Sequence, residues 1–173
     1  MEEQQVKTGK FALNYGLLMG LISVVFGVML YTQKMHYETS TAVIVISIVI
    51  LAAIIFLAIN AFKKANGGYL TISEALKVAV GVALVGAIIS LVYQFVLTNF
   101  IEPDFMDKAM EIAKPKAMAQ NPNMTEEQWE QGVEMQKSFA WIQYPVLLIM
   151  NCVLGLILGL ISGLILKKSK ADY

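Results

Sequence analysis

Long apolar stretches alternate with polar segments along the whole chain. Four apolar stretches, at 11–31, 41–62, 75–100 and 145–166, are each close to the ~20 residues that a helix needs to cross a bilayer. A lone β-strand in lipid could not pair its backbone, so even the Ile- and Val-rich stretch 41–62 is predicted to be helical. Because this stretch has no glycine, we expect it to face lipid. The pattern predicts four transmembrane helices.

The long polar segment 101–141 lies between the third and fourth stretches. It opens with an acidic, proline-containing turn at 102–104 that is typical of a helix start. Helical spacing of apolar residues continues to Pro115, where we expect a kink or a stop. A break at 121–123 is followed by the capping-box pattern Thr125-x-x-Gln128, which opens a second helix. The segment is therefore predicted to be a two-helix hairpin outside the membrane.

A polar elbow at 63–74 separates the second and third stretches. It begins with basic residues and a Gly-Gly pair, as helix C-termini often do. Thr71 and Glu74 then show the capping-box pattern of a helix start. The elbow is thus predicted to end one span and begin the next, although neither motif requires Tyr69.

Composition supports a membrane protein. The 173 residues are 57% apolar and 15% charged, with a mean hydropathy of +0.64, whereas soluble domains contain about 25% charged residues. We therefore expect one all-α integral membrane domain over residues 1–173, with the lipid bilayer as its main partner. The net charge is +0, and no basic surface suggests a nucleic-acid partner.

Lysines are concentrated beside one set of span ends. Basic residues near span ends mark the cytoplasmic side of a membrane. Both termini and the elbow are therefore predicted to be cytoplasmic, and the hairpin extracytoplasmic. The lysines concerned are Lys7, Lys10, Lys63, Lys64, Lys167, Lys168 and Lys170.

Glycines recur at helical spacing in the first and fourth spans. Gly16 and Gly20 share a helical face, and Gly155, Gly159 and Gly163 form a GxxxGxxxG row. Small residues at this spacing let helix backbones approach closely. They could close the bundle of one chain or join several copies in a homo-oligomer. Packing within one chain is preferred, but both uses remain open.

The elbow also holds the candidate functional residues Tyr69, Glu74 and Lys77. Ionisable residues at the membrane end of a span are candidates for a gate, a proton site or a lipid-headgroup contact. The simpler interpretation is that Glu74 caps its helix while Lys77 extends to the interface.

Catalytic and metal-binding patterns are missing. The sequence has no nucleophile with a matching base, no paired carboxylates in apolar settings and no phosphate-binding glycine loop. We therefore expect neither an enzyme nor a bound cofactor. Met106, Met110 and His36 are expected on one side of the membrane, and thioethers prefer Cu(I). Because methionine also fills packing gaps and tight repeats are missing, no metal site is predicted.

Three sequence segments carry a resemblance to a known family: 68–77 (GYLTISEALK), 99–104 (NFIEPD) and 121–127 (NPNMTEE). With these segments the chain resembles an uncharacterised bacterial family of small four-span inner-membrane proteins. The resemblance implies a multi-pass protein of the bacterial inner membrane. It implies no activity or substrate.

Two functions are compatible with this sequence. The first is an interaction protein that binds a membrane-protein partner or lipid through glycine-lined faces and the acidic hairpin. The alternative is a small oligomeric transporter or channel that uses Glu74, Lys77 and the amide side chains of the spans. A transporter needs a continuous polar path, and few polar residues lie near mid-membrane. These are Ser23, Ser47, Ser90 and Asn151.

Overall fold

The computed structural model describes residues 6–38 and 40–168, and in this part of the chain it contains helices and no β-strand. Four helices are long and apolar enough to cross a membrane: α1, α2, α3 with its extension η1, and α6 with the preceding turn η2. This confirms the all-α, four-span prediction. The elements are α1 Thr8–Thr32, α2 Thr41–Ala65, α3 Ile72–Val96, the π-helical η1 Leu97–Ile101, α4 Phe105–Gln120, α5 Glu126–Ser138, the 3-10 turn η2 Ala140–Ile142 and α6 Gln143–Leu166.

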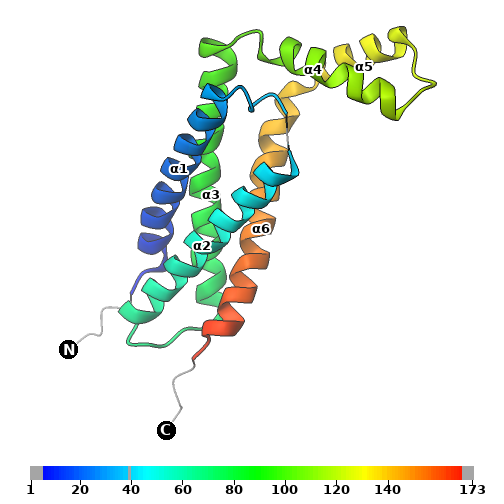
Figure 1. Cartoon of the computed structure of the whole chain (residues 1–173). Coiled ribbons are helices and arrows are strands. Elements are labelled where there is room, and N and C mark those ends of the chain that lie inside the picture. Colours follow the sequence, from blue (N-terminus) through cyan, green and yellow to red (C-terminus); the bar gives the residue numbers. More distant parts are fainter. Residues whose placement is uncertain (1–5, 39, 169–173) are drawn as a thin grey trace.

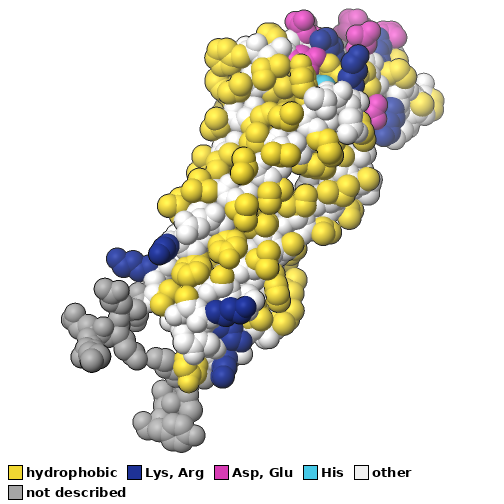
Figure 2. All heavy atoms as spheres, turned by 60° about the vertical axis from the view of Figure 1, so that its left-hand side comes forward, with side chains coloured by type: hydrophobic (Ala, Val, Ile, Leu, Met, Phe, Trp, Pro, Cys, Tyr) yellow, Lys and Arg dark blue, Asp and Glu magenta, His cyan; other side chains and the backbone are white. Residues whose placement is uncertain are grey.

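The four spanning helices form a bundle, and the α4–α5 hairpin projects sideways from one end of it (Figure 1). The α2–α3 elbow, the start of α1 and the end of α6 lie together at the opposite end. We call these the hairpin end and the elbow end. On the face drawn in Figure 2, acidic side chains gather at the hairpin end, and the charged side chains that can be seen at the elbow end are lysines. Of the lysines used to predict topology, Lys170 lies outside the described residues.

Helix α3 is the central helix because small residues let α6 lie directly on it. A Cβ atom at Gly159 would lie 2.5 Å from the Cβ of Ala79, closer than real carbon atoms approach. Gly155 and Gly163 are buried in the same way, and the alanines that face this row are Ala75, Ala79 and Ala83. The GxxxGxxxG row therefore packs inside the bundle.

The glycines of α1 pack on another face of α3. A Cβ atom at Gly16 would lie 2.5 Å from the Cβ of Val85, and one at Gly20 would lie 2.6 Å from the Cβ of Ile89. Both glycines are buried. Neither glycine row is thus available to a second copy of the chain.

The tightest core lies in the elbow half of the bundle. Side chains of α2, α3 and the elbow are fully buried there: Ile55, Ile59, Phe62, Leu70, Val78 and Val82. The expectation that the second span faces lipid is therefore wrong for its second half. Helix α2 crosses the bundle, so its C-terminal turns pack inside even though they lack glycine (Figure 1).

The hairpin differs from its prediction in two places. Helix α4 begins at Phe105, so the turn at 102–104 precedes the helix. Pro115 lies inside α4, which continues to Gln120, so of the two predicted effects, a kink or a stop, the stop does not occur. The proline is exposed, and water can solvate the carbonyl that loses its backbone donor. The predicted capping box at Thr125 and Gln128 is confirmed.

The elbow has the predicted caps. Gly67 and Gly68 follow the C-terminus of α2 with φ values of 66° and 85°, a conformation that glycine adopts without strain. The Thr71 hydroxyl accepts from the N–H of Glu74 at 3.2 Å, and the Glu74 carboxylate accepts from the N–H of Thr71 at 2.8 Å. The capping box at the start of α3 is therefore confirmed.

This cap can be tested by separating the carboxylate charge of Glu74 from its hydrogen bond. Glu74→Gln keeps an acceptor for the N–H of Thr71, whereas Glu74→Ala removes it. We expect Glu74→Ala to lose about 0.5–1 kcal/mol of unfolding free energy and Glu74→Gln to lose less than half of that. Thermal unfolding of the purified variants in detergent measures both. An equal loss would show that the charge itself matters and would favour a functional role for Glu74.

Candidate functional site

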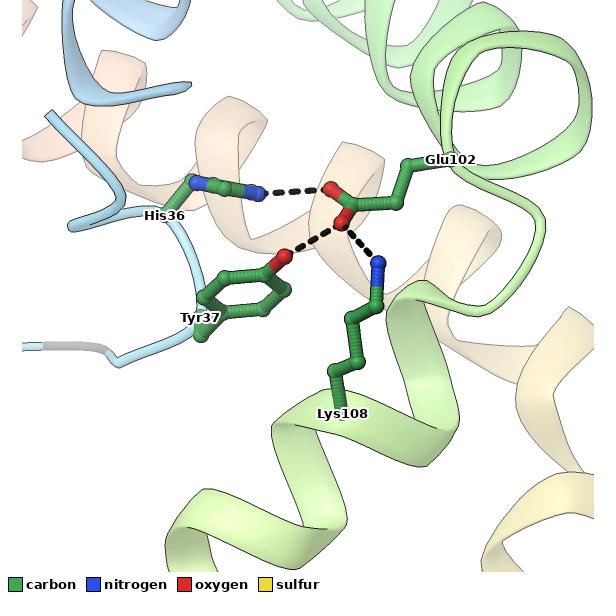
Figure 3. A network of polar contacts seen from close by, with 4 residues as sticks. All are labelled: His36, Tyr37, Glu102 and Lys108. Atoms are coloured by element: carbon green, nitrogen blue, oxygen red, sulfur yellow. Dashed lines mark hydrogen bonds and ion pairs between the residues drawn. The ribbon is translucent and has the colours of Figure 1, made fainter. Parts of the chain in front are cut away.

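One buried carboxylate organises the hairpin end. Glu102 follows η1 directly, its side chain is 10% exposed, and its two oxygens accept from three donors (Figure 3). His36 Nε2 lies 2.9 Å from Oε2, Lys108 Nζ lies 2.8 Å from Oε1, and the Tyr37 hydroxyl donates to Oε1. We call His36, Tyr37, Glu102 and Lys108 the outer cluster.

The local fold explains why these residues meet. Glu102 ends the π-helical turn, since its N–H donates to the carbonyl of Leu97 at 2.7 Å, and α4 then starts so that Lys108 can reach back to it. The link between α1 and α2 turns at Lys34, whose φ is 57°. That turn brings His36 and Tyr37 against the end of α3. The outer cluster thus ties the α1–α2 link to the root of the hairpin.

Aromatic rings bury the imidazole of His36. Its ring centroid lies 5.0 Å from that of Tyr31, 4.0 Å from Tyr37 and 5.8 Å from Phe105. The side chain of His36 is only 7% exposed. Nδ1 is buried and has no hydrogen-bond partner within residues 6–38 and 40–168. An unpaired buried polar atom of this kind is uncommon in proteins.

The electrostatics keep Glu102 ionised. Hydrogen bonds from Lys108, Tyr37 and His36, in that order, lower its pKa to about 2, although burial acts in the opposite direction. The hydrogen bond to Glu102 raises the pKa of Lys108 and is also the largest cause of the raised pKa of Tyr37. Glu102 therefore accepts hydrogen bonds at neutral pH and has no proton to donate.

A cavity of about 300 Å³ lies between the four spanning helices, in the half of the bundle nearer the hairpin. We call it the bundle cavity. Its wall is mostly apolar, but it collects all the polar residues that the sequence places near mid-membrane. Its polar side chains come from all four helices: Ser23, Ser47, Ser90, Tyr93, Gln94 and Asn151.

Three of these polar side chains donate to their own helix. Ser47 Oγ donates to the carbonyl of Val43 at 2.8 Å, Ser90 Oγ to that of Gly86 at 3.0 Å, and Asn151 Nδ2 to that of Leu147 at 2.9 Å. A hydroxyl or amide group that donates in this way keeps oxygen lone pairs with which to accept. These three side chains therefore suit a molecule that brings hydrogen-bond donors.

A second cavity of about 150 Å³ lies beside the bundle cavity and is lined by one residue of the outer cluster, His36. We call it the upper cavity. Its lining includes His36 and Phe105 as well as residues that also line the bundle cavity. The shared residues are Gly27, Leu30, Val43, Tyr93 and Gln94. The two cavities are thus adjacent, with the imidazole of His36 at the hairpin end of the pair.

The candidate residues of the elbow lie at the other end of the bundle. Glu74 forms the helix cap, and Lys77 is exposed on α3. Backbone hydrogen bonds of 2.9 and 3.1 Å join Leu70 to Lys168, just after α6, and the ammonium of Lys168 lies 5.7 Å from the ring centroid of Tyr69. Tyr69, which the caps leave unexplained, thus holds the end of α6 through a cation–π contact.

The structure does not bring Met106 and Met110 to the upper cavity that His36 lines. In the described ranges, no group of three or more His, Cys, Asp or Glu side chains could hold a metal ion.

Sequence reasoning missed the outer cluster. Glu102 looked like one of the acids that open a helix, and His36 like one residue of a short polar link. A weaker signal was available, because an acid at the end of one span and a histidine at the end of another lie at the same membrane level.

One comparison with known proteins gave a match. The family described as "Protein of unknown function (DUF4199)" matches residues 14–168. No curated protein matches the chain, and no solved structure does.

Proposed function

The chain belongs to the DUF4199 family of proteins of unknown function, and we propose that it binds a small amphipathic molecule in the bundle cavity. The match over residues 14–168 agrees with the resemblance to an uncharacterised four-span family. As part of this proposal, the protein crosses a bacterial cytoplasmic membrane several times, with the lysine-rich elbow end in the cytoplasm. Its task is binding rather than catalysis.

The observation that carries this proposal is the convergence of polar side chains on one cavity. Ser23, Ser47, Ser90 and Asn151 come from four different helices, yet all line the bundle cavity. Ligand sites are typically apolar pockets of about 300–1,000 Å³ with a few convergent polar groups. The bundle cavity, at about 300 Å³, fits this description.

The elbow half of the bundle favours binding over an open channel. Leu51 lines the cavity, and the next turns of α2 contribute Ile55 and Ile59, which have no exposed surface. Val82, also fully buried, packs in the same core from α3. The polar lining of the cavity therefore does not continue to the elbow end, and a carrier would have to repack this core to release its ligand there.

The alternative of an interaction protein loses part of its support. It relied on glycine-lined faces, and Gly16, Gly20 and Gly159 are buried against α3. The acidic hairpin remains as a surface for a partner. The convergence of polar residues on the cavity gives ligand binding the stronger support.

Cysteine labelling tests the proposal. In a Cys152→Ala background, Ser90→Cys places one thiol in the bundle cavity. We expect it to react with a small, water-soluble methanethiosulfonate reagent in detergent or nanodiscs. Hexanol or hexylammonium at about ten times its Kd should slow the reaction about tenfold, because only the free sites react.

The matched control is Ile88→Cys in the same background. Ile88 is also on α3 but is 46% exposed on the outside of the bundle, where lipid or detergent covers it. Its labelling should be slow and should not change when either probe is added. The proposal is wrong if Ser90→Cys labels no faster than Ile88→Cys, or if neither probe protects it.

A further inference from the structure

We infer that the elbow end binds phospholipids with a net negative headgroup, through lysines that all four spanning helices contribute. This surface is separate from the bundle cavity, so the inference does not rest on the proposed function. It also holds whichever side of the membrane the elbow end faces. We call the lysines described at this end the elbow lysines: Lys7, Lys10, Lys63, Lys64, Lys77, Lys167 and Lys168.

Every elbow lysine lies near the end of a spanning helix. Two lie at the start of α1, two in the last turn of α2, one in the second turn of α3 and two directly after α6. The headgroups of a bilayer lie where the spans end. A lysine there can lay its apolar stem along the helix and hold its ammonium among the headgroups.

Contacts between the helices hold these ends at one level (Figure 1). Phe11 of α1 and Phe62 of α2 pack edge to face, with their ring centroids 5.6 Å apart. One turn beyond the lysine of α3, a Cβ atom at Gly81 would lie 2.5 Å from the Cβ of Ala12 on α1. The backbone pairing of Lys168 with the elbow fixes the end of α6. The elbow lysines therefore meet the headgroups of the same leaflet.

The elbow lysines have no carboxylate partners in the described part of the chain. Within residues 6–38 and 40–168, every ion pair lies at the hairpin end. The one acid at the elbow end in these ranges is Glu74, whose carboxylate accepts from the N–H and the hydroxyl of Thr71 at 2.8 Å each. Six of the elbow lysines are exposed, and only Lys63 is half-buried. Their charges are therefore free to attract anions.

The residues outside the described ranges do not cancel this charge. Residues 1–5 and 169–173 add Glu2, Glu3, Asp172 and Lys170 to the sequence count. Counted with the elbow lysines and Glu74, they give eight lysines against four acids, and the rest of the chain holds five lysines and nine acids. The charge is thus unequal between the two ends, and a negative membrane surface is attracted to the elbow end only.

The surface beside the elbow lysines favours a lipid over a soluble acidic partner. Leu13, Leu164 and Ile165 lie within a turn of a lysine and are 51%, 60% and 68% exposed. A molecule that covers both these side chains and the ammonium groups needs acyl chains and an anionic headgroup. A phospholipid such as phosphatidylglycerol has both. Each lysine close to an anionic membrane surface strengthens the attraction roughly fivefold.

Lipid competition gives the first test. The purified full-length protein in dodecylmaltoside is mixed with equal amounts of dioleoyl phosphatidylglycerol and dioleoyl phosphatidylcholine, and native mass spectrometry counts the bound lipids. We expect bound phosphatidylglycerol to exceed bound phosphatidylcholine about fivefold or more. Raising ammonium acetate from about 0.1 M to about 1 M should cut this ratio to less than half, because salt screens the lysines. Equal binding at low salt, or a ratio that salt leaves unchanged, would overturn the inference.

Paired variants locate the site. Lys77→Gln with Lys167→Gln removes two exposed elbow lysines and should cut the phosphatidylglycerol excess to less than half. The control, Lys34→Gln with Lys116→Gln, removes two exposed lysines of the hairpin end that form no ion pair in the described ranges, and it should keep the excess. Equal effects of the two pairs would contradict the inference. The salt series on the unchanged protein decides the question if a variant does not fold.

Free glycerol phosphate separates a lipid site from a simple anion site. It carries a phosphate without acyl chains, so at the concentration of the lipid it should leave bound phosphatidylglycerol in place. If it displaces the lipid, the elbow lysines bind soluble anions and the membrane-lipid assignment is wrong.

Discussion

Replacing Gly159 by leucine is expected to prevent α6 from packing on α3 and to leave little folded protein. Even the Cβ of alanine would lie 2.5 Å from the Cβ of Ala79 and 3.6 Å from the carbonyl oxygen of Ala75. Both belong to the central helix of the bundle, so neither can move without disturbing the core. For Gly159→Ala we expect a loss of about 1–3 kcal/mol, typical of overpacking, and for Gly159→Leu a larger loss. Thermal unfolding and size-exclusion chromatography in detergent measure both.

The chain offers a direct control and a rescue for this variant. Gly132 lies in α5 with nothing within 4 Å of its Cβ position, so Gly132→Ala should stabilise that helix by about 0.5–1 kcal/mol. The double variant Gly159→Ala with Ala79→Gly moves the methyl group to the other side of the same contact. It should recover much of the stability that Gly159→Ala loses. A double variant that is no more stable than Gly159→Ala would show that this contact is not what holds α6.

The sequence predicts the spans and the helix caps between them because both depend on residues that are close together in the chain. A stretch such as 145–166 has to be helical in lipid whatever its neighbours are. The caps at Thr71 and Thr125 are formed by residues three positions apart, and both are present. Glycine spacing likewise indicates which face of α6 packs closely, although the spacing alone leaves open what it packs against.

The outer cluster and the cavity depend on how the helices are placed around one another. His36 and Glu102 are 66 residues apart, and nothing in either local pattern indicates that they meet. The apolar stretches place four polar residues at similar depths in the membrane: Ser23, Ser47, Ser90 and Asn151. They line a shared cavity only because each of the four helices turns its polar position inward. Hydropathy sets the depth of a residue in the membrane and says little about that rotation. Four scattered polar residues in the sequence thus form one site in the structure.

Glu102→Ala should be the most damaging substitution at the hairpin end. It removes the acceptor for His36, Tyr37 and Lys108 together. The Nε2–H of His36 would then be buried without a partner, at a cost of about 1–3 kcal/mol. Glu102→Gln keeps an acceptor oxygen but loses the charge, so we expect an intermediate loss. Thermal unfolding measures the series, and Glu134→Ala on the exposed side of α5 should unfold close to the unchanged protein.

The stabilisation by Glu102 also has a predicted pH dependence. Its pKa is about 2 in the folded protein against an ordinary value of 4.5, so the unfolded chain takes up the proton first as the pH falls. The stabilisation is therefore complete above about pH 4.5 and is lost progressively down to about pH 2. Glu102→Gln has no proton to gain, so its stability should fall less steeply across this range than that of the unchanged protein. Parallel curves for the two proteins would mean that the carboxylate is not held by these three donors.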